Sequence, residues 1–166
     1  MEETELRREF LMTIGRAYRS YGFPEYYGYV EALLALESGE LSQQMISHKL
    51  REILPEPKYA TSVPSVNRAL KVLESYGVAE KTGSRKTGYG YRFMSSSSLI
   101  ASMLQQILQG NRQFVERLRT LTVQNKGKDR SLSRAIAAEI EIAEVWDTII
   151  GQSLSSLSGK QGVQVT

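Results

Sequence analysis

The feature that most constrains this chain is a change in the spacing of its apolar residues at Gly77. Before that glycine, apolar residues recur every three or four positions, which predicts an amphipathic helix over residues 62–76. After it, residues 78–82 and 89–93 alternate around a glycine-rich turn, which predicts two short antiparallel strands. A helix that runs directly into a β-hairpin indicates a mainly helical domain with a small sheet.

The two ends of this helix carry recognisable stop signals. Ser62 is a suitable N-cap, and Pro64 falls in the first turn, where no backbone donor is needed. Gly77 is a suitable C′ residue. In the hairpin that follows, residues 83–90 form the turn region, and the tip, residues 84–86, is Ser-Arg-Lys. The hairpin is therefore expected to present positive charge at its tip.

Three helices are predicted before this segment. Apolar residues at helical spacing indicate helices over residues 4–20 and 25–38, and Ser42 is the predicted N-cap of a third that extends to about residue 54. The loop at residues 55–61, which joins the third helix to the helix at 62–76, is longer than the tight turn of a minimal helix-turn-helix.

The C-terminal part is predicted to be helical. Residues 94–98 form a polar connector, and a heptad stripe of apolar residues then covers three repeats. That stripe consists of Ile100, Leu104, Ile107, Asn111, Phe114, Leu118 and Leu121. Residues 125–129 interrupt it, and a last helix is expected over residues 131–157.

The predicted fold class is mainly α with a small β-hairpin, with four regions in chain order. Residues 1–24 form an N-terminal helix for packing or dimerisation, and residues 25–94 form the domain that carries the hairpin. Residues 95–157 form a helical dimerisation region, and residues 158–166 form a flexible tail.

Composition excludes several classes of function. The 166-residue chain is 41% hydrophobic and 23% charged, as in ordinary globular proteins. It has no cysteine, which excludes disulfides, thiolate metal sites and cysteine nucleophiles. No apolar run reaches the roughly 18 residues of a membrane span, and the acidic residues 1–5 do not resemble a secretory signal. We therefore expect a cytoplasmic protein without a membrane partner.

Positive charge gathers in the middle of the chain. Residues 1–50 hold 5 Lys or Arg against 8 Asp or Glu, whereas residues 51–100 hold 8 against 4. The basic segment coincides with the predicted helix and hairpin, so an anionic partner is expected to bind there.

The side chains of helix 62–76 and of the hairpin suit double-stranded DNA. At about 100° per residue, Pro64, Arg68 and Lys71 lie opposite the apolar stripe, flanked by Ser65 and Asn67. Arg can bond guanine and Asn adenine in pairs of hydrogen bonds, while hairpin cations suit the phosphate backbone. The predicted DNA-binding residues are Ser62, Pro64, Ser65, Asn67, Arg68, Lys71, Lys81, Ser84, Arg85, Lys86 and Arg92.

Three segments resemble a known family. Residues 61–78, TSVPSVNRALKVLESYGV, resemble the recognition helix and strand entry of MarR-type winged helix-turn-helix regulators, and residues 83–91 resemble their wing. Residues 14–18 and 21–24 resemble the N-terminal helix of the GbsR-like branch. The resemblance implies a homodimeric transcription factor, often a repressor, which a small-molecule effector sometimes releases from DNA. A protein of this kind is expected in the cytoplasm, associated with the nucleoid.

The heptad stripe also supports dimerisation. A second, separate argument is that two-fold pairing doubles the DNA contacts that a single winged helix makes. The residues predicted to pair two chains are Ile100, Leu104, Ile107, Asn111, Phe114, Leu118 and Trp146. A buried Asn in such a stripe can fix the register of the pairing. The alternative, which stays open, is that the stripe packs on the last helix of the same chain.

Two other functions use the same fold. The chain could be an architectural or plasmid-partition protein with little sequence preference, or its winged helix could bind another protein, which the basic hairpin argues against. No nucleophile–base pair, phosphate-binding glycine motif or metal-ligand cluster is evident, so we expect no enzyme, no cofactor and no metal. The tyrosines at positions 18, 21, 26, 27 and 29 either pack the core or line an effector pocket.

Overall fold

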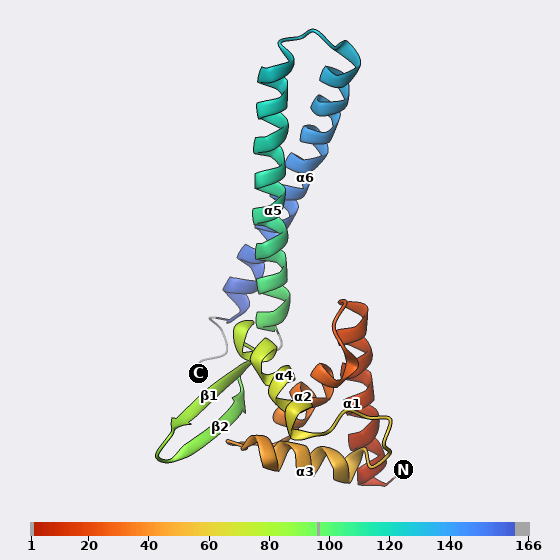
Figure 1. Cartoon of the computed structure of the whole chain (residues 1–166), viewed down its shortest axis with the longest axis vertical. Helices are drawn as coiled ribbons and strands as arrows, with labels where there is room; N and C mark the ends of the chain where they lie inside the picture. Colours follow the sequence, from red (N-terminus) through yellow and green to blue (C-terminus); the bar gives the residue numbers. More distant parts are fainter. Residues whose placement is uncertain (1, 96, 162–166) are drawn as a thin grey trace. The chain divides into compact units, whose positions relative to one another are not determined.

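The structure is a computed structural model, which describes residues 2–95 and 97–161. These residues form six helices and one two-stranded antiparallel sheet (Figure 1), which confirms the predicted mainly helical class with a small hairpin. The elements follow in the order α1 (Glu3–Ser20), α2 (Glu25–Leu36), α3 (Gln43–Ile53), α4 (Val63–Ser75), β1 (Ala79–Ser84), β2 (Gly88–Phe93), α5 (Ser97–Asn125) and α6 (Arg130–Gln161). The chain divides after Leu99 into two compact units, here called the head and the α5–α6 hairpin.

In the head, α1 and α2 cross at two glycines. A Cβ built on Gly28 of α2 would lie 2.6 Å from the Cα of Gly15 in α1 and 2.6 Å from the carbonyl oxygen of Ile14. A Cβ built on Gly15 would collide with the ring of Tyr29. Because glycine has no Cβ, the two helix backbones touch directly, and α1 is fixed against α2.

The core of the head is built around α2. Every residue from Gly28 to Leu34 is buried, so this helix is covered on all sides by the rest of the head. The other helices bury only one stripe each, as an amphipathic sequence predicts. The fully buried side chains that meet here include Leu11, Leu33, Leu34, Ile46, Leu50, Val66, Leu70 and Leu73.

The β1–β2 hairpin is anchored to this core at its base. Its register runs from Ala79 opposite Phe93 to Ser84 opposite Gly88. Leu41, in the segment between α2 and α3, exchanges two backbone hydrogen bonds with Tyr91 of β2, at 2.9 and 2.8 Å. Both residues of this bridge are buried, so the base of the hairpin is rigid while its tip projects from the head.

Some predicted boundaries shift. Helix α2 ends at Leu36 rather than Ser38, and β1 begins at Ala79 rather than Val78. Helix α6 extends to Gln161, so the predicted start of the tail at residue 158 is wrong, and residues 162–166 of that tail lie outside the described residues. The break predicted at residues 125–129 is confirmed, since α5 ends at Asn125 and α6 begins at Arg130. Asp129 caps α6 by accepting a hydrogen bond from the N–H of Leu132 at 3.0 Å.

The glycine crossing yields a stability prediction. Gly28→Ala should destabilise the head by about 1–3 kcal/mol, because the new Cβ meets the α1 backbone and cannot be accommodated by a side-chain rotation. The matched control is Gly151→Ala in α6, where a Cβ meets nothing within 4 Å and alanine favours the helix by up to about 1 kcal/mol. Urea unfolding followed by circular dichroism measures both, and equal effects at the two positions would contradict the role of the crossing.

Candidate nucleic-acid interface

Helix α4 is capped as its sequence predicts. The side chain of Ser62 accepts a hydrogen bond from the backbone N–H of Ser65 at 3.4 Å, and Pro64 occupies the first turn. At the other end Gly77 has φ +73°, a left-handed conformation in which glycine is unstrained. These local signals set both ends of the helix.

The exposed side of α4 carries polar and basic groups. Pro64, Arg68 and Lys71 are exposed, and Asn67 is half-buried beside them. The opposite stripe, which includes Leu70, packs in the core. Two cations and one carboxamide therefore lie on one side of a rigidly packed helix.

Ser65 is placed differently from its prediction as a DNA contact. Its side chain is buried, and its Oγ lies 3.0 Å from the Oγ of Ser62. Residue 65 is one helical turn before Ala69, so it lies on the edge of the buried stripe rather than on the exposed side. The Ser65 hydroxyl therefore supports the N-cap.

A carboxamide pair that sequence reasoning missed joins α3, α4 and the β-hairpin. Gln43, the first residue of α3, donates from Nε2 to Oδ1 of Asn67 at 3.0 Å and lies 3.4 Å from the hydroxyl of Tyr91 in β2. The bond fixes the orientation of the Asn67 amide, because Oδ1 must face Gln43. The sequence signal was the position of Gln43 directly after an N-cap serine, at the start of the helix before α4.

Tyr26 of α2 lies beside the exposed side of α4. Burial is the main cause that raises the pKa of the Tyr26 hydroxyl, with the neighbouring Tyr27 as a further cause, and the positive charge of Arg68 opposes the rise. The two tyrosine rings meet edge to face, with centroids 4.8 Å apart. In the sequence, Tyr26 is one of five neighbouring tyrosines, and no local pattern indicates that it lies near Arg68 of α4.

The tip of the hairpin is a stiff turn. Gly83 has φ +87° and Gly88 has φ +84°, and a Cβ on Gly83 would collide with the carbonyl oxygen of Gly88. Between them, the N–H of Ser84 donates to Oγ1 of Thr87 at 3.0 Å, and the N–H of Thr87 donates to Oγ of Ser84 at 3.2 Å. Ser84, a predicted DNA contact, therefore shapes the turn that displays the tip.

The four cations of the hairpin are not equivalent. Arg85 and Lys86 are exposed at the tip, and the Nζ of Lys81 lies 4.1 Å from the ring centroid of Tyr89. Arg92 is directly opposite Glu80 in the sheet, and its Nε donates to Oε2 of that carboxylate at 2.6 Å. The ion pair neutralises Arg92, so the positive charge of the hairpin is concentrated toward its tip.

Comparison with solved structures identifies this arrangement. The chain is similar to a crystal structure of a protein described as a transcriptional regulator, with a TM-score of 0.59 over 92% of this chain and 98% of the other, at 13% sequence identity. The head has a winged-helix fold. The β1–β2 hairpin is its wing, and α3 and α4 are its helix-turn-helix. The sequence matches no profile of a known protein family and no curated protein.

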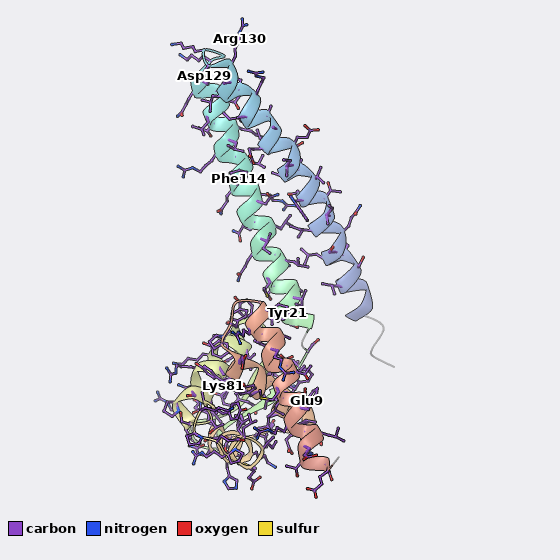
Figure 2. The ribbon with its side chains drawn as sticks, turned by 90° about the vertical axis from the view of Figure 1, so that its right-hand side faces the viewer. Glu9, Tyr21, Lys81, Phe114, Asp129 and Arg130 are labelled. Atoms are coloured by element: carbon purple, nitrogen blue, oxygen red, sulfur yellow. The ribbon has the colours of Figure 1, made fainter. Side chains whose placement is uncertain are left out.

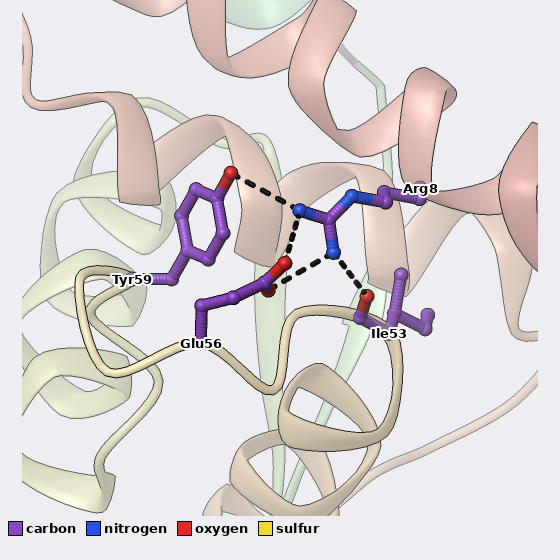
Figure 3. A network of polar contacts seen from close by, with 4 residues as sticks. All are labelled: Arg8, Ile53, Glu56 and Tyr59. Carbon is purple, nitrogen blue, oxygen red and sulfur yellow. Dashed lines mark hydrogen bonds and ion pairs between the residues drawn. The ribbon is translucent and has the colours of Figure 1, made fainter.

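The long loop between α3 and α4 of the winged helix is held by one arginine from α1 (Figure 3). Arg8 donates from Nη2 to Oε1 of Glu56 at 2.7 Å and from Nη1 to Oε2 at 3.0 Å, a two-pronged ion pair. It also donates to the carbonyl oxygen of Ile53 and to the hydroxyl of Tyr59, both at 3.3 Å. One side chain thus bonds the end of α3 and two points of the loop.

Further bonds tie the loop to α3 and α2. The buried Oγ of Ser47 donates to the carbonyl oxygen of Thr61 at 2.7 Å, one residue before the N-cap of α4. The ring of Tyr59 meets that of Tyr29 edge to face, with centroids 5.9 Å apart. Because both ends of the loop are held, the start of α4 is fixed relative to α1 and α3.

The predicted tyrosine cluster divides between core and surface. Tyr18 and Tyr29 are buried, whereas Tyr21 is exposed. An open cavity of about 370 Å³ adjoins α1, α2 and the α3–α4 loop. Its lining residues are Met12, Glu25, Tyr26, Tyr29, Lys58, Tyr59 and Ala60.

Two other findings concern the described residues. None of the helices in residues 2–95 and 97–161 is both long and apolar enough to cross a membrane. In the same part of the chain no three acidic or histidine side chains gather as metal ligands would. The Nε2 of His48, an exposed residue of α3, lies 3.2 Å from Oε1 of Glu52 on the same helix.

The Arg8–Glu56 pair predicts a pH effect on the stability of the head. The hydrogen bond from Arg8 is the main cause that holds the pKa of Glu56 below its ordinary value of about 4.5. A lowered folded-state pKa stabilises the fold above the unfolded pKa, and this stabilisation is lost as the pH falls through the lower, folded-state value. Wild-type protein should therefore lose more stability than Glu56→Gln between neutral pH and pH values below about 4.5.

Thermal unfolding at a series of pH values tests this effect. The control is the same comparison in an Arg8→Gln background. There the substitution Glu56→Gln should no longer change how stability depends on pH, because the donor that lowers the pKa of Glu56 is gone. An effect of Glu56→Gln that is the same with and without Arg8 would refute the assignment.

Proposed function

We propose that this protein is a transcriptional regulator that binds double-stranded DNA, with α4 in the major groove and the wing on the backbone or in the minor groove. One observation carries the proposal. A helix with exposed Arg68 and Lys71 and a stiff hairpin with exposed Arg85 and Lys86 belong to the same winged-helix head, where Gln43 links them. A helix and a hairpin of this kind fit adjacent grooves of one duplex.

Specificity is assigned to α4. Arg68 can donate to two acceptors of guanine, and Lys71 to bases or phosphates. Asn67 has its amide oriented by Gln43, so Nδ2 remains as a donor and Oδ1 keeps its second lone pair as an acceptor. These are the two groups that adenine requires. The N-terminus of α4 at Ser62 adds backbone donors suited to a phosphate.

Affinity without sequence preference is assigned to the wing. Lys81, Arg85 and Lys86 supply charge that displaces counterions from phosphates. Arg92, which the sequence placed in this set, is paired with Glu80 and contributes little while that pair is intact. The wing therefore strengthens binding to any duplex, whereas α4 selects the site.

The finer parts of the proposal rest on the resemblance of residues 61–78 and 83–91 to MarR-type regulators of the GbsR-like branch. These finer parts are homodimerisation, repression of transcription at the nucleoid in the cytoplasm, and modulation by a small-molecule effector. The solved structure that is similar over nearly its whole length, described as a transcriptional regulator, supports the coarser statement.

Selection from random duplex DNA tests the proposed function. A regulator enriches one operator sequence, and that site resists competition by random duplex. Arg68→Ala should reduce the preference for the operator over random DNA by about 1–3 kcal/mol, because a base contact is lost. Arg134→Ala, the same charge change in α6, serves as the control. Equal competition by random duplex would favour an architectural protein, and no binding at low salt would favour a protein-interaction module.

Loss of positive charge from the wing should affect DNA binding differently from loss of Arg68. Replacing both Arg85 and Lys86 by Ala should weaken binding to the operator and to random duplex by similar factors. The fall of log affinity with log salt concentration should also become less steep, by about 2 in slope. Replacing Lys126 and Lys128 in the α5–α6 loop changes the net charge equally and is the matched control. A loss confined to the operator, or an unchanged salt slope, would contradict a backbone role for the wing.

A further inference from the structure

The two faces of the wing follow from the register of its strands. Residues directly opposite each other point to the same face of a sheet, and successive residues of one strand alternate between faces. Lys81 is paired with Tyr91, and Tyr89 lies two residues from Tyr91 on the same strand, so the three share one face, here called the tyrosine face. Thr82 and its partner Gly90 point to the opposite face.

At the base of the wing, the tyrosine face is turned toward the helix-turn-helix. Tyr91 is buried, and its hydroxyl lies 3.4 Å from Nε2 of Gln43, which donates to Asn67 of α4. Farther along the wing the same face is exposed at Lys81, which Figure 2 labels, and at Tyr89. A duplex bound by α4 would therefore meet the wing on the face that carries Lys81 and Tyr89.

The two faces also differ in charge. A Cβ built on Gly90 would lie 3.2 Å from the Cβ of Glu40 and 3.4 Å from its Oε2, so the Glu40 carboxylate lies over the opposite face. The same face carries Glu80 with its partner Arg92, which makes two carboxylates against one guanidinium. Among the described residues of β1 and β2, the tyrosine face has one cation, Lys81, and no acidic residue. Phosphate is therefore attracted to the tyrosine face rather than to the opposite one.

Lys81 and Tyr89 form a pair that suits a sugar–phosphate backbone. The Nζ of Lys81 lies 4.1 Å from the ring centroid of Tyr89, within reach of a cation–π contact. This contact restricts the positions of the lysine side chain, which stays exposed to a phosphate. The hydroxyl of Tyr89 is a second donor of a kind that often bonds phosphate oxygens.

We propose that the tyrosine face is the surface of the wing that meets DNA. Lys81 and Tyr89 bind neighbouring phosphates of one strand, and the ring of Tyr89 covers apolar surface of the deoxyribose between them. The inference rests on the proposed function and deepens it, because it adds Tyr89 as a DNA contact and gives the wing an orientation. Both contacts are to the backbone, so they do not depend on base sequence.

Binding to a short duplex of mixed sequence tests the role of Tyr89, since a backbone contact needs no operator. Tyr89→Phe keeps the ring beside Lys81 and removes only the hydroxyl. Affinity should fall about tenfold, which corresponds to one hydrogen bond to a charged acceptor. The salt dependence should stay that of wild type, because a neutral side chain displaces no counterion. The control is Tyr21→Phe, at a tyrosine that is 41% exposed against 44% for Tyr89, and it should bind like wild type.

Failure of the inference is distinguishable from failure of the proposed function. If the wild type binds no duplex at low salt, the proposed function fails and the inference fails with it. If the wild type binds, and loss of Arg85 and Lys86 weakens that binding while Tyr89→Phe matches Tyr21→Phe, the wing meets DNA and only the inference is overturned.

Moving one cation tests which face of the wing meets DNA. Lys81→Thr combined with Thr82→Lys keeps the composition and net charge of the wing but turns the lysine to the opposite face, where Glu40 lies. The fall of log affinity with log salt concentration should become less steep, by about 1 in slope, as it should in Lys81→Ala.

Thermal unfolding shows whether the exchanged protein keeps the stability of the wild type. A wild-type salt slope in the exchanged protein, or in Lys81→Ala, would overturn the orientation. If the exchange lowers stability, Lys81→Ala and Tyr89→Phe decide the question, because neither places a new charge on the opposite face.

Discussion

The position of α4, the helix proposed to enter the major groove, depends on a contact that lies away from it, the crossing of α1 and α2 at Gly15 and Gly28. Neither glycine has a side chain, so the two helix backbones touch. Because protein interiors are close-packed, this contact fixes the position of α1 relative to α2. Arg8 lies seven residues before Gly15, about two turns along the same side of α1. The crossing therefore brings the Arg8 guanidinium to the loop that precedes α4, where it bonds Glu56, Ile53 and Tyr59.

Around α4, too, a single side chain contacts several elements. Gln43 orients the amide of Asn67 while it lies beside the hydroxyl of Tyr91, so the first helix of the helix-turn-helix, the second helix and the wing share one polar junction. The wing is stiff because two glycines at positive φ and a Ser84–Thr87 pair define its turn. The groups assigned to DNA are thus presented by elements that are already rigid, which reduces the entropy lost on binding.

Local signals made much of this head predictable. Ser42, Ser62, Pro64 and Gly77 determine where α3 and α4 begin or end, and each acts within a few residues of its own position. The burial of Ser65 was missed because helical period alone does not say how wide the buried stripe is. Neither the Arg8–Glu56 pair, 48 residues apart, nor the Gln43–Asn67 pair, 24 residues apart, has a local signature. In α5, the heptad pattern predicted an apolar stripe that includes Asn111, but it could not show that Asn111 bonds the carbonyl oxygen of Ala143 in α6 of the same chain.

The Glu80–Arg92 pair has a kinetic consequence. In the proposed complex with DNA, a wing cation that is held by a carboxylate in the neighbouring strand adds little to the attraction of phosphate. Such a complex should therefore dissociate faster than the basic composition of the wing alone would give. Short residence on random duplex lets a protein leave wrong sites quickly. If the head binds DNA as proposed, one acidic residue opposite one arginine would shorten the time that it spends at each wrong site.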